Sequence, residues 1–389
     1  MNSFDDIRPY NDDEVCDVLD QLVQNHELLA LLASFRLGPW ARYIPSKLSD
    51  FVVRRYLTKE LRDVKDVRSF QVVVARYMNR MIEDSTTEFT VSGLHKLDPN
   101  KPYLFMSNHR DITLDPAFTT YALYHNNRDT GRVAIGDNLL KTPYVSDLMR
   151  LNKSFIVNRS ATGPRQVLAA YRNLSAYIWH SINVDGESIW LAQREGRAKD
   201  GLDKTEPAVI KMLSMCRDKN VETFEEHLGA LNIVPVAISY EWDPCDGVKA
   251  AELYEREYYG EYQKDENEDV KSIGIGISGQ KGHVHVAFGT QLTENLDSPE
   301  KVTQQLDRQV IHNYKLHSTN YFAYYHLYNK WPDYVALGED APFNPQQHLS
   351  QQLEFQNRID ALPEGHRNYV LDIYANAIVS KLMLESSCE

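Results

Sequence analysis

One histidine and two nearby carboxylates could form a catalytic group in this chain. His109 follows an apolar stretch at residues 103–106 and is followed by Asp111 and Asp115. A carboxylate that folds back onto a histidine fixes its tautomer and stabilises the imidazolium, which lets the imidazole act as a general base. A loop between a strand and a helix suits such a group, because it is held firmly and remains open to substrate. His109 is therefore the first candidate catalytic residue, and a histidine that merely caps a loop is the simpler alternative.

Three further polar clusters each accompany a predicted strand. They are Arg159 after residues 155–157, Glu195-Gly196-Arg197 after residues 188–191, and Pro235 inside residues 233–238. In an open parallel sheet, ligands bind beyond the carboxyl ends of the strands. Two arginines that meet a histidine there could bind the phosphate of an acceptor beside a base, because a guanidinium pairs with two phosphate oxygens at once. A single surface arginine is usually only solvated, so the prediction depends on the ordered set of four clusters.

The elements that must position these clusters alternate between strands and helices. Short, continuous apolar strands separated by helices run from about residue 86 to residue 290, and helical patterns precede and follow them. Such strands are typical of a largely parallel sheet that is buried on both faces. We predict an α/β fold, in which a mostly parallel sheet is covered by helices on both faces. The expected regions are a helical N-terminal region at 1–85, an α/β domain at 86–295 and a helical C-terminal region at 296–389.

Pro116 decides how the segment after His109 is interpreted. Asp115 is a suitable N-cap and Pro116 a suitable first residue of a helix, so we predict that a helix starts there. The triplet His109-Arg110-Asp111 matches the catalytic loop of protein kinases, but Pro116 stands where that loop needs its metal-binding Asn. No Asp-Phe-Gly sequence follows either, which excludes a kinase.

The glycines at positions 274, 276 and 279 have the spacing of a dinucleotide-binding fingerprint. However, residues 273–277 and 283–286 both alternate between two residue types, which predicts a β-hairpin and not a strand that leads into a helix. His283 and His285 would then share one strand face, as a pair of metal ligands does. Without a third ligand nearby, an ordinary structural role is the expected one.

Composition and charge narrow the function classes. The chain has 389 residues, of which 42% are hydrophobic and 25% charged, and this is typical of a folded soluble protein. Its net charge of −13 argues against nucleic acid as the main partner. The four cysteines are scattered without metal-ligand spacing, which fits a reducing, cytoplasmic compartment. The N-terminus does not resemble a secretory signal, and the longest apolar stretch, residues 28–35, is too short to span a bilayer.

One segment of this acidic chain is basic. Residues 36–68 hold nine Lys or Arg and four Asp or Glu. Aromatic and aliphatic residues lie among them: Trp40, Tyr43, Phe51, Val52, Val53 and Tyr56. Basic residues interleaved with aromatics suit an anionic membrane surface, although an ordinary solvated helix face has the same composition. We therefore predict a peripheral protein that could dock on the inner face of a membrane through this segment.

The four clusters together resemble the glycerolipid acyltransferases, which comprise glycerol-3-phosphate and lysophosphatidate acyltransferases. The family has an H-x4-D block, an arginine block, an E-G-x-R-S block and an apolar I-V-P-V block, which match here in order over residues 90–245. The resemblance implies that His109 is the catalytic base and that Arg159 binds phosphate. It further assigns Glu195, Gly196 and Arg197 to the third block and Pro235 to the fourth. Residues 233–241 look closer to the glycerol-3-phosphate branch.

Two departures from the family pattern affect the site. Asp115 lies six residues after His109 where the family has five, so one residue is inserted in the loop; Asp115 is the expected acid partner and Asp111 its competitor. In the third block Arg197 follows Gly196 directly, so the block is one residue short. Lys199 or Lys204 could replace its phosphate contact.

The resemblance implies an O-acyltransferase of phospholipid synthesis. It would move a fatty acyl group from a thioester donor, acyl-CoA or acyl carrier protein, to a hydroxyl of glycerol-3-phosphate or lysophosphatidate, and it would need no metal or redox cofactor. Two alternatives remain open: an acyltransferase that acts on another lysolipid, and a non-catalytic lipid-binding protein built on the same fold.

Overall fold

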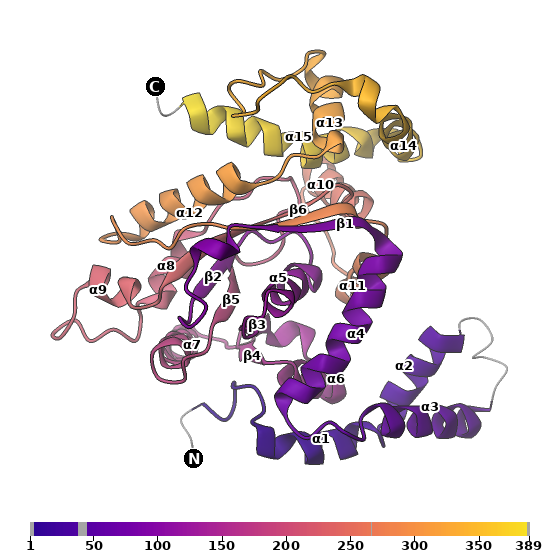
Figure 1. The fold of residues 1–389 in the computed structure, drawn as a ribbon, viewed down its shortest axis with the longest axis vertical. Helices are drawn as coiled ribbons and strands as arrows, with labels where there is room; N and C mark the ends of the chain where they lie inside the picture. Colours follow the sequence, from indigo (N-terminus) through magenta and orange to yellow (C-terminus); the bar gives the residue numbers. More distant parts are fainter. Residues whose placement is uncertain (1–3, 38–44, 266, 387–389) are drawn as a thin grey trace. The chain divides into compact units, whose positions relative to one another are not determined.

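A computed structural model of the chain describes residues 4–37, 45–265 and 267–386. The chain divides into two compact units (Figure 1). The first consists of Met1–Arg80 and Gly131–Tyr177, and the second of Met81–Thr130 and Ile178–Glu389. Two helices, α4 (Val67–Ser85) and α7 (Pro164–Asn183), each contain a boundary between the units. The predicted division into regions 1–85, 86–295 and 296–389 remains a prediction.

The first unit combines helices with one pair of strands. Its elements are α1 (Val15–Leu22), α2 (His26–Leu37), α3 (Ser46–Glu60), β3 (Arg132–Gly136), α6 (Pro143–Leu151) and β4 (Ser154–Val157). Strands β3 and β4 pair in parallel. Leu19 of α1, Phe70 of α4 and Leu151 of α6 share one buried apolar cluster. This unit therefore has a core of its own, as a compact folding unit requires.

The second unit contains five strands in the order β1-β7-β6-β2-β5. Their bounds are β1 (Thr86–Ser92), β2 (Leu104–Ser107), β5 (Ile189–Ala192), β6 (Ile233–Tyr240) and β7 (Gly282–Phe288). Neighbouring strands run parallel except β6 and β7, which are antiparallel. All eight residues of β6 are buried. This confirms the predicted α/β fold with mostly parallel strand pairs.

Helices cover both faces of the sheet in this unit. Its helices are α5 (Leu114–His125), α8 (Pro207–Leu213), α9 (Phe224–Gly229), α10 (Asp246–Tyr259), α11 (Glu268–Ser278), α12 (Pro299–Asn313), α13 (Ser318–Tyr328), α14 (Leu349–Asp360) and α15 (Glu364–Ser386). Because side chains alternate along a strand, Tyr240 and Ala237 of β6 point to opposite faces. Tyr240 packs against Phe118 of α5, whereas Ala237 packs against Val310 of α12. Figure 1 shows α5 and α12 on the two sides of this part of the sheet.

Two sequence predictions differ from the structure. The glycine-rich segment was predicted as the first strand of a hairpin, but it forms the helix α11, and only residues 282–288 form a strand. The predicted alternation covered five residues, which is too short to separate a strand from a helix. Strand β3 was not predicted, because it is only half-buried and includes Arg132. Among the described residues, no helix is both long and apolar enough to cross a bilayer.

Candidate active site

A buried asparagine ties the strand before His109 to its neighbour. Asn108 follows β2; its amide nitrogen donates to the carbonyl of Ile238 at 3.0 Å, and its amide oxygen accepts from the Ile238 N–H at 2.8 Å. The same nitrogen donates to Asp203 at 3.1 Å. On the other side, the carbonyl of His109 accepts from the N–H of Ala198 at 2.7 Å. The backbone at His109 is therefore held from both directions, with the buried polar groups satisfied.

His109 contacts one of the two carboxylates that the sequence offered. Its Nδ1 lies 2.8 Å from Oδ2 of Asp115. A carboxylate accepts at that position, so Nδ1 carries the proton and Nε2 keeps its lone pair. The ring packs edge to face against Trp190, and 14% of the His109 side chain is exposed. One ring nitrogen is thus oriented by an acid, and the other has the form that a general base requires.

Asp115 is fully buried and accepts four hydrogen bonds. Besides His109, Oδ2 accepts from the backbone N–H groups of Arg110 at 2.6 Å and Asp111 at 2.9 Å. Its Oδ1 accepts from the Tyr240 hydroxyl at 2.7 Å. Burial, with the charges of Asp115 and Asp111, raises the pKa of Tyr240 well above its ordinary value, so the hydroxyl stays a donor. Tyr240 was not predicted as a site residue from the sequence; the available signal was a tyrosine at the end of a buried strand, whose hydroxyl needs a partner.

The competing carboxylate, Asp111, caps the following helix. Its Oδ1 accepts from the N–H groups of Thr113 at 2.9 Å and Leu114 at 2.8 Å. Helix α5 begins at Leu114, with Thr113 in the N-cap position. The prediction that Asp115 caps this helix and Pro116 is its first residue was therefore wrong. Asp111 satisfies the first N–H groups, which leaves the Asp115 carboxylate to turn back into the preceding loop.

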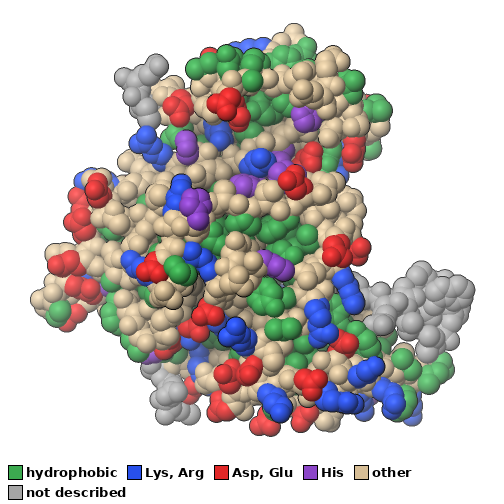
Figure 2. Space-filling model, viewed as in Figure 1, with side chains coloured by type: hydrophobic (Ala, Val, Ile, Leu, Met, Phe, Trp, Pro, Cys, Tyr) green, Lys and Arg blue, Asp and Glu red, His purple; other side chains and the backbone are tan. Residues whose placement is uncertain are grey.

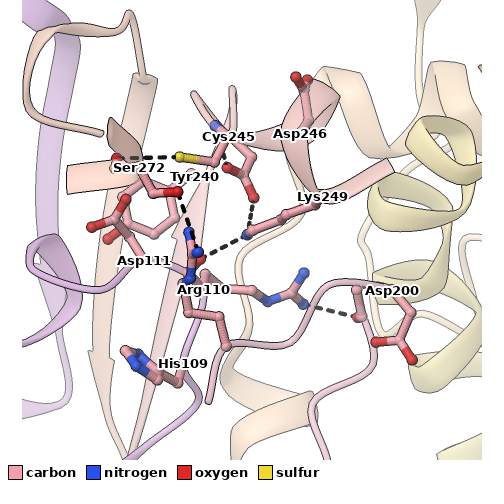
Figure 3. A network of polar contacts seen from close by, with 12 residues as sticks. His109, Arg110, Asp111, Asp200, Tyr240, Cys245, Asp246, Lys249 and Ser272 are labelled. Atoms are coloured by element: carbon pink, nitrogen blue, oxygen red, sulfur yellow. Dashed lines mark hydrogen bonds and ion pairs between the residues drawn. The ribbon is translucent and has the colours of Figure 1, made fainter. Parts of the chain in front are cut away.

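Arg110 belongs to a buried network of charges behind His109. Its guanidinium donates to both carboxylate oxygens of Asp203, at 3.0 and 2.6 Å. From α10, Lys249 donates to the Arg110 carbonyl at 2.7 Å and pairs with Asp243. Figure 3 shows the His109 ring pointing away from the Arg110 guanidinium. These paired charges hold the loop backbone, and removing one partner would leave another charge buried and unpaired.

The third predicted cluster lies in the loop after β5. Glu195 and Gly196 are exposed, and Gly196 has a φ of +74°, in the left-handed region that favours glycine. Arg197 is half-buried, and its Nη2 lies 3.4 Å from Oγ of Ser272 on α11. Since Ala198 is hydrogen-bonded to His109, this loop is joined directly to the histidine loop. The structure therefore brings the third cluster to the same edge of the sheet as His109.

The two lysines that could replace the missing phosphate contact differ in their surroundings. Lys199 donates to the buried carboxylate of Glu252. Although Glu252 raises the pKa of Lys199, burial lowers it more, so it ends below its ordinary value. Lys204 is exposed. Lys199 is thus held by the protein, and a phosphate contact by Lys204 stays a prediction.

Arg159 lies in the other unit, in the exposed loop after β4. The N–H groups of Arg159 and Ser160 donate to the carboxylate of Asp137 at 3.1 and 3.0 Å, which fixes the loop. A Cβ on Gly136 would lie 3.0 Å from the Arg159 Nε, so the side chain passes close to that glycine. The structure positions Arg159 within its own unit, and its approach to His109 stays a prediction.

Pro235 and the two β7 histidines make structural contacts within the sheet. Pro235 is buried in β6 opposite Met106, and its carbonyl accepts from the Gly289 N–H at 2.8 Å. His283 and His285 share one face of β7, as predicted, and both contact the Thr90 hydroxyl at 2.6 Å. In the part of the chain that the structure describes, no group of three or more His, Cys, Asp or Glu side chains is placed to hold a metal ion.

Comparison with known proteins identifies the domain around this site. Residues 88–238 match the family model described as Acyltransferase, and they include His109 and Asp115. This stretch of the chain is therefore similar to an acyltransferase domain, in agreement with the resemblance of the four clusters. Among solved structures it is similar to the 1-acyl-sn-glycerophosphate (LPA) acyltransferase, PlsC, from Thermotoga maritima, with 14% identity and a TM-score of 0.38, over 73% of this chain and 92% of that one. No curated protein sequence matches the chain.

Proposed function

We propose that this chain is a glycerolipid acyltransferase. It moves a fatty acyl group from a thioester donor, acyl-CoA or acyl carrier protein, to a hydroxyl of glycerol-3-phosphate or lysophosphatidate. The observation that carries the proposal is the contact between His109 and Asp115 inside the acyltransferase domain, 2.8 Å from Nδ1 to Oδ2. The contact leaves Nε2 as the basic atom, which a base acting on an alcohol needs.

In the mechanism, His109 first accepts a proton and later donates it. Nε2 of His109 removes the proton of the acceptor hydroxyl, and Asp115 stabilises the imidazolium that forms. The acceptor oxygen attacks the thioester carbonyl directly, and a backbone N–H stabilises the negative charge on the carbonyl oxygen. When the intermediate collapses, the imidazolium protonates the departing thiolate. No acyl-enzyme is formed, and none of these steps draws on a metal or redox group.

The proposed roles of Arg159 and Arg197 lie with the acceptor phosphate. Substituting either by Ala should raise the acceptor KM with a smaller change for the donor, because neither side chain touches the reacting carbonyl. A lost hydrogen bond to a charged group costs on the order of 1.5–3 kcal/mol, which corresponds to about a 10- to 150-fold rise. Steady-state kinetics with each substrate varied in turn measures this. Arg165→Ala, at an exposed arginine of α7, is the matched control, and a defect confined to donor KM would place these arginines on the donor side.

A product analysis tests the function as a whole. The protein is incubated with acyl-CoA or acyl carrier protein and with several acceptors in parallel, and lipid products are identified by mass spectrometry. Acylated glycerol-3-phosphate or lysophosphatidate is the expected product, and exclusive use of a lysolipid without a free phosphate would replace the acceptor proposed here. Thioester consumption separates an enzyme from a non-catalytic lipid-binding protein. The intact pairing of His109 with Asp115 favours the enzyme.

Helix α3 offers the surface for a peripheral, cytoplasmic-side association with an anionic membrane. Three apolar side chains, Leu48, Phe51 and Val52, are 54%, 62% and 57% exposed. Arg55 and Lys59 are also exposed, and this spacing places all five on one side of the helix. The opposite side buries Val53 with residues of α2, and Figure 2 shows basic and apolar side chains together over this region. Trp40 and Tyr43 of the predicted basic segment lie outside the described residues.

Substituting Arg54, Arg55 and Lys59 together by Gln should release the protein from anionic vesicles. Each basic residue near such a surface contributes on the order of 1 kcal/mol, and the contribution fades within a Debye length as salt rises. Co-sedimentation with vesicles of varied anionic content measures binding. Activity on a short-chain, water-soluble donor should survive. The control replaces three exposed lysines elsewhere by Gln: Lys96, Lys211 and Lys330. Equal losses in both variants would show only a general charge effect.

A further inference from the structure

A cysteine, a histidine and a glutamate meet in the segment between α8 and α9. Cys216 and Glu222 lie in the connecting turns, and His227 lies in α9. The Cys216 Sγ is 3.8 Å from Nε2 of His227, and the Glu222 carboxylate is 2.8 Å from Nδ1. These residues belong to none of the four acyltransferase clusters. The order thiol, imidazole, carboxylate is the one that activates a nucleophile.

The surroundings of His227 determine its charge. The side chain is 1% exposed, and both ring nitrogens face oxygen acceptors: Nδ1 the Glu222 carboxylate, and Nε2 the Leu213 carbonyl at 3.1 Å. A neutral imidazole has one N–H and would leave a lone pair facing one of these oxygens. Only the imidazolium form of His227 donates to both the Glu222 carboxylate and the Leu213 carbonyl. Burial alone would lower the pKa of His227, but its contacts with Cys216 and Glu222 raise it above its ordinary value.

An imidazolium beside a thiol favours the thiolate, which is the reactive form of cysteine. Cys216 is half-buried, so part of the residue is open to solvent. The other described cysteines differ: Cys16 is exposed, and Cys245 is buried with its Sγ 3.5 Å from the Ser272 carbonyl. Burial raises the pKa of Cys245 to about 12, which keeps it a thiol.

The segment holds the three groups in a defined arrangement. Thr223 caps α9, its hydroxyl accepting from the Glu226 N–H at 3.2 Å, while the Glu226 carboxylate accepts from the Thr223 N–H at 2.7 Å. The Arg217 guanidinium donates to the Glu222 carbonyl at 3.2 Å, which closes the turns between Cys216 and α9. The pairing is therefore built into the fold by a capping box and a side-chain bridge.

We propose that Cys216, His227 and Glu222 form a second nucleophilic site, at which Cys216 is modified by low-molecular-weight disulfides. The thiolate attacks one sulfur of the disulfide, a new S–S bond forms to Cys216, and the original S–S bond breaks. The departing thiolate takes a proton from water. Two electrons pass from the cysteine to the departing sulfur, so no further oxidant is needed. His227 and Glu222 act as positioning residues that favour the thiolate.

The test compares Cys216 with Cys16 inside one protein. The full chain is treated with oxidised glutathione, and separately with uncharged 2,2′-dithiodipyridine to remove charge effects, and each cysteine peptide is followed by mass spectrometry. At pH 7 Cys216 should react roughly 5- to 10-fold faster than Cys16. Cys388 lies outside the described residues and is followed as a separate peptide.

Glu222→Gln should lower the reaction rate of Cys216 several-fold and leave that of Cys16 unchanged. His227→Gln should make Cys216 react no faster than Cys16. The Glu222 side chain is 29% exposed, so its variant remains informative if the buried His227 variant fails to fold. In denaturant the two wild-type thiols should react at similar rates. A Cys216 rate no faster than that of Cys16, or an advantage that survives both substitutions in folded protein, would overturn the proposal. Acyl transfer by Cys216→Ser should match wild type.

Discussion

His109→Ala should abolish acyl transfer while the protein keeps its fold. The substitution removes the ring whose Nδ1 is held by Asp115 and whose Nε2 is the proposed base. Loss of a general base typically lowers the rate by roughly 10²–10⁴. Turnover is measured with a short-chain soluble donor, so that membrane docking does not affect the result, and the fold is checked by circular dichroism and thermal unfolding.

The matched control is His95→Ala, which removes an exposed histidine of the same unit. It should turn over at the wild-type rate. Near wild-type turnover in well-folded His109→Ala would exclude His109 as the base. A loss in both variants would point to a general effect of the substitution, and the mechanism would then need another base.

The fold could be predicted where burial leaves a continuous apolar signal. Strand β6 was expected from residues 233–238, because a strand buried on both faces must be apolar throughout. Helix α11 was not expected, because its isoleucines and glycines alternate. The structure gives one of these glycines a packing reason: a Cβ on Gly276 would lie 2.4 Å from Oδ2 of Asp111. Glycine therefore lets α11 approach the histidine loop, and this spatial requirement leaves no periodic signal.

The site was predictable only where it is local in sequence. His109 lies in the loop before α5 and Asp115 in the first turn of that helix, so their residue types and spacing indicated a pair. The groups that hold this pair come from distant segments: Tyr240 from the end of β6, and Lys249 from α10. Such contacts depend on how the strands and helices pack. A single sequence shows that residue 249 is a lysine, but it does not show which carbonyl accepts a hydrogen bond from its ammonium group.

Asp115→Asn should be far more damaging than Asp111→Asn. The Asp115 carboxylate accepts at both oxygens, from the His109 ring and two backbone N–H groups at Oδ2 and from the Tyr240 hydroxyl at Oδ1. An amide keeps only one accepting oxygen and carries no negative charge to stabilise the imidazolium. The histidine loses its orienting acid, so the rate should fall by roughly 10²–10⁴. Unpaired buried donors also cost about 1–3 kcal/mol each in stability.

Asp111→Asn should be mild for two reasons. The Asn oxygen can still accept from Thr113 and Leu114 and so continue to cap α5. Burial and the charge of Asp115 raise the pKa of Asp111 in the folded protein. Ionising this carboxyl therefore costs stability, which is lost as pH rises through the raised pKa. A neutral amide removes this cost, and the variant should lose less stability than wild type as pH rises from about 4, the ordinary pKa of an aspartic acid, to 8. Thermal unfolding across this range measures the difference.

Tyr240→Phe keeps the comparison informative if Asp115→Asn does not fold. It removes one of the four donors to Asp115 but leaves the contact with His109 in place. Stability should fall by about 1–3 kcal/mol, because Oδ1 of Asp115 loses its buried partner, while kcat should fall much less than in Asp115→Asn.

Acyl transfer and unfolding are measured on all three variants under the same conditions. Equal rate losses in Asp111→Asn and Asp115→Asn would show that the acid that orients His109 during turnover is not Asp115 alone. A loss in Tyr240→Phe as large as that in His109→Ala would instead place the tyrosine hydroxyl itself in the chemistry.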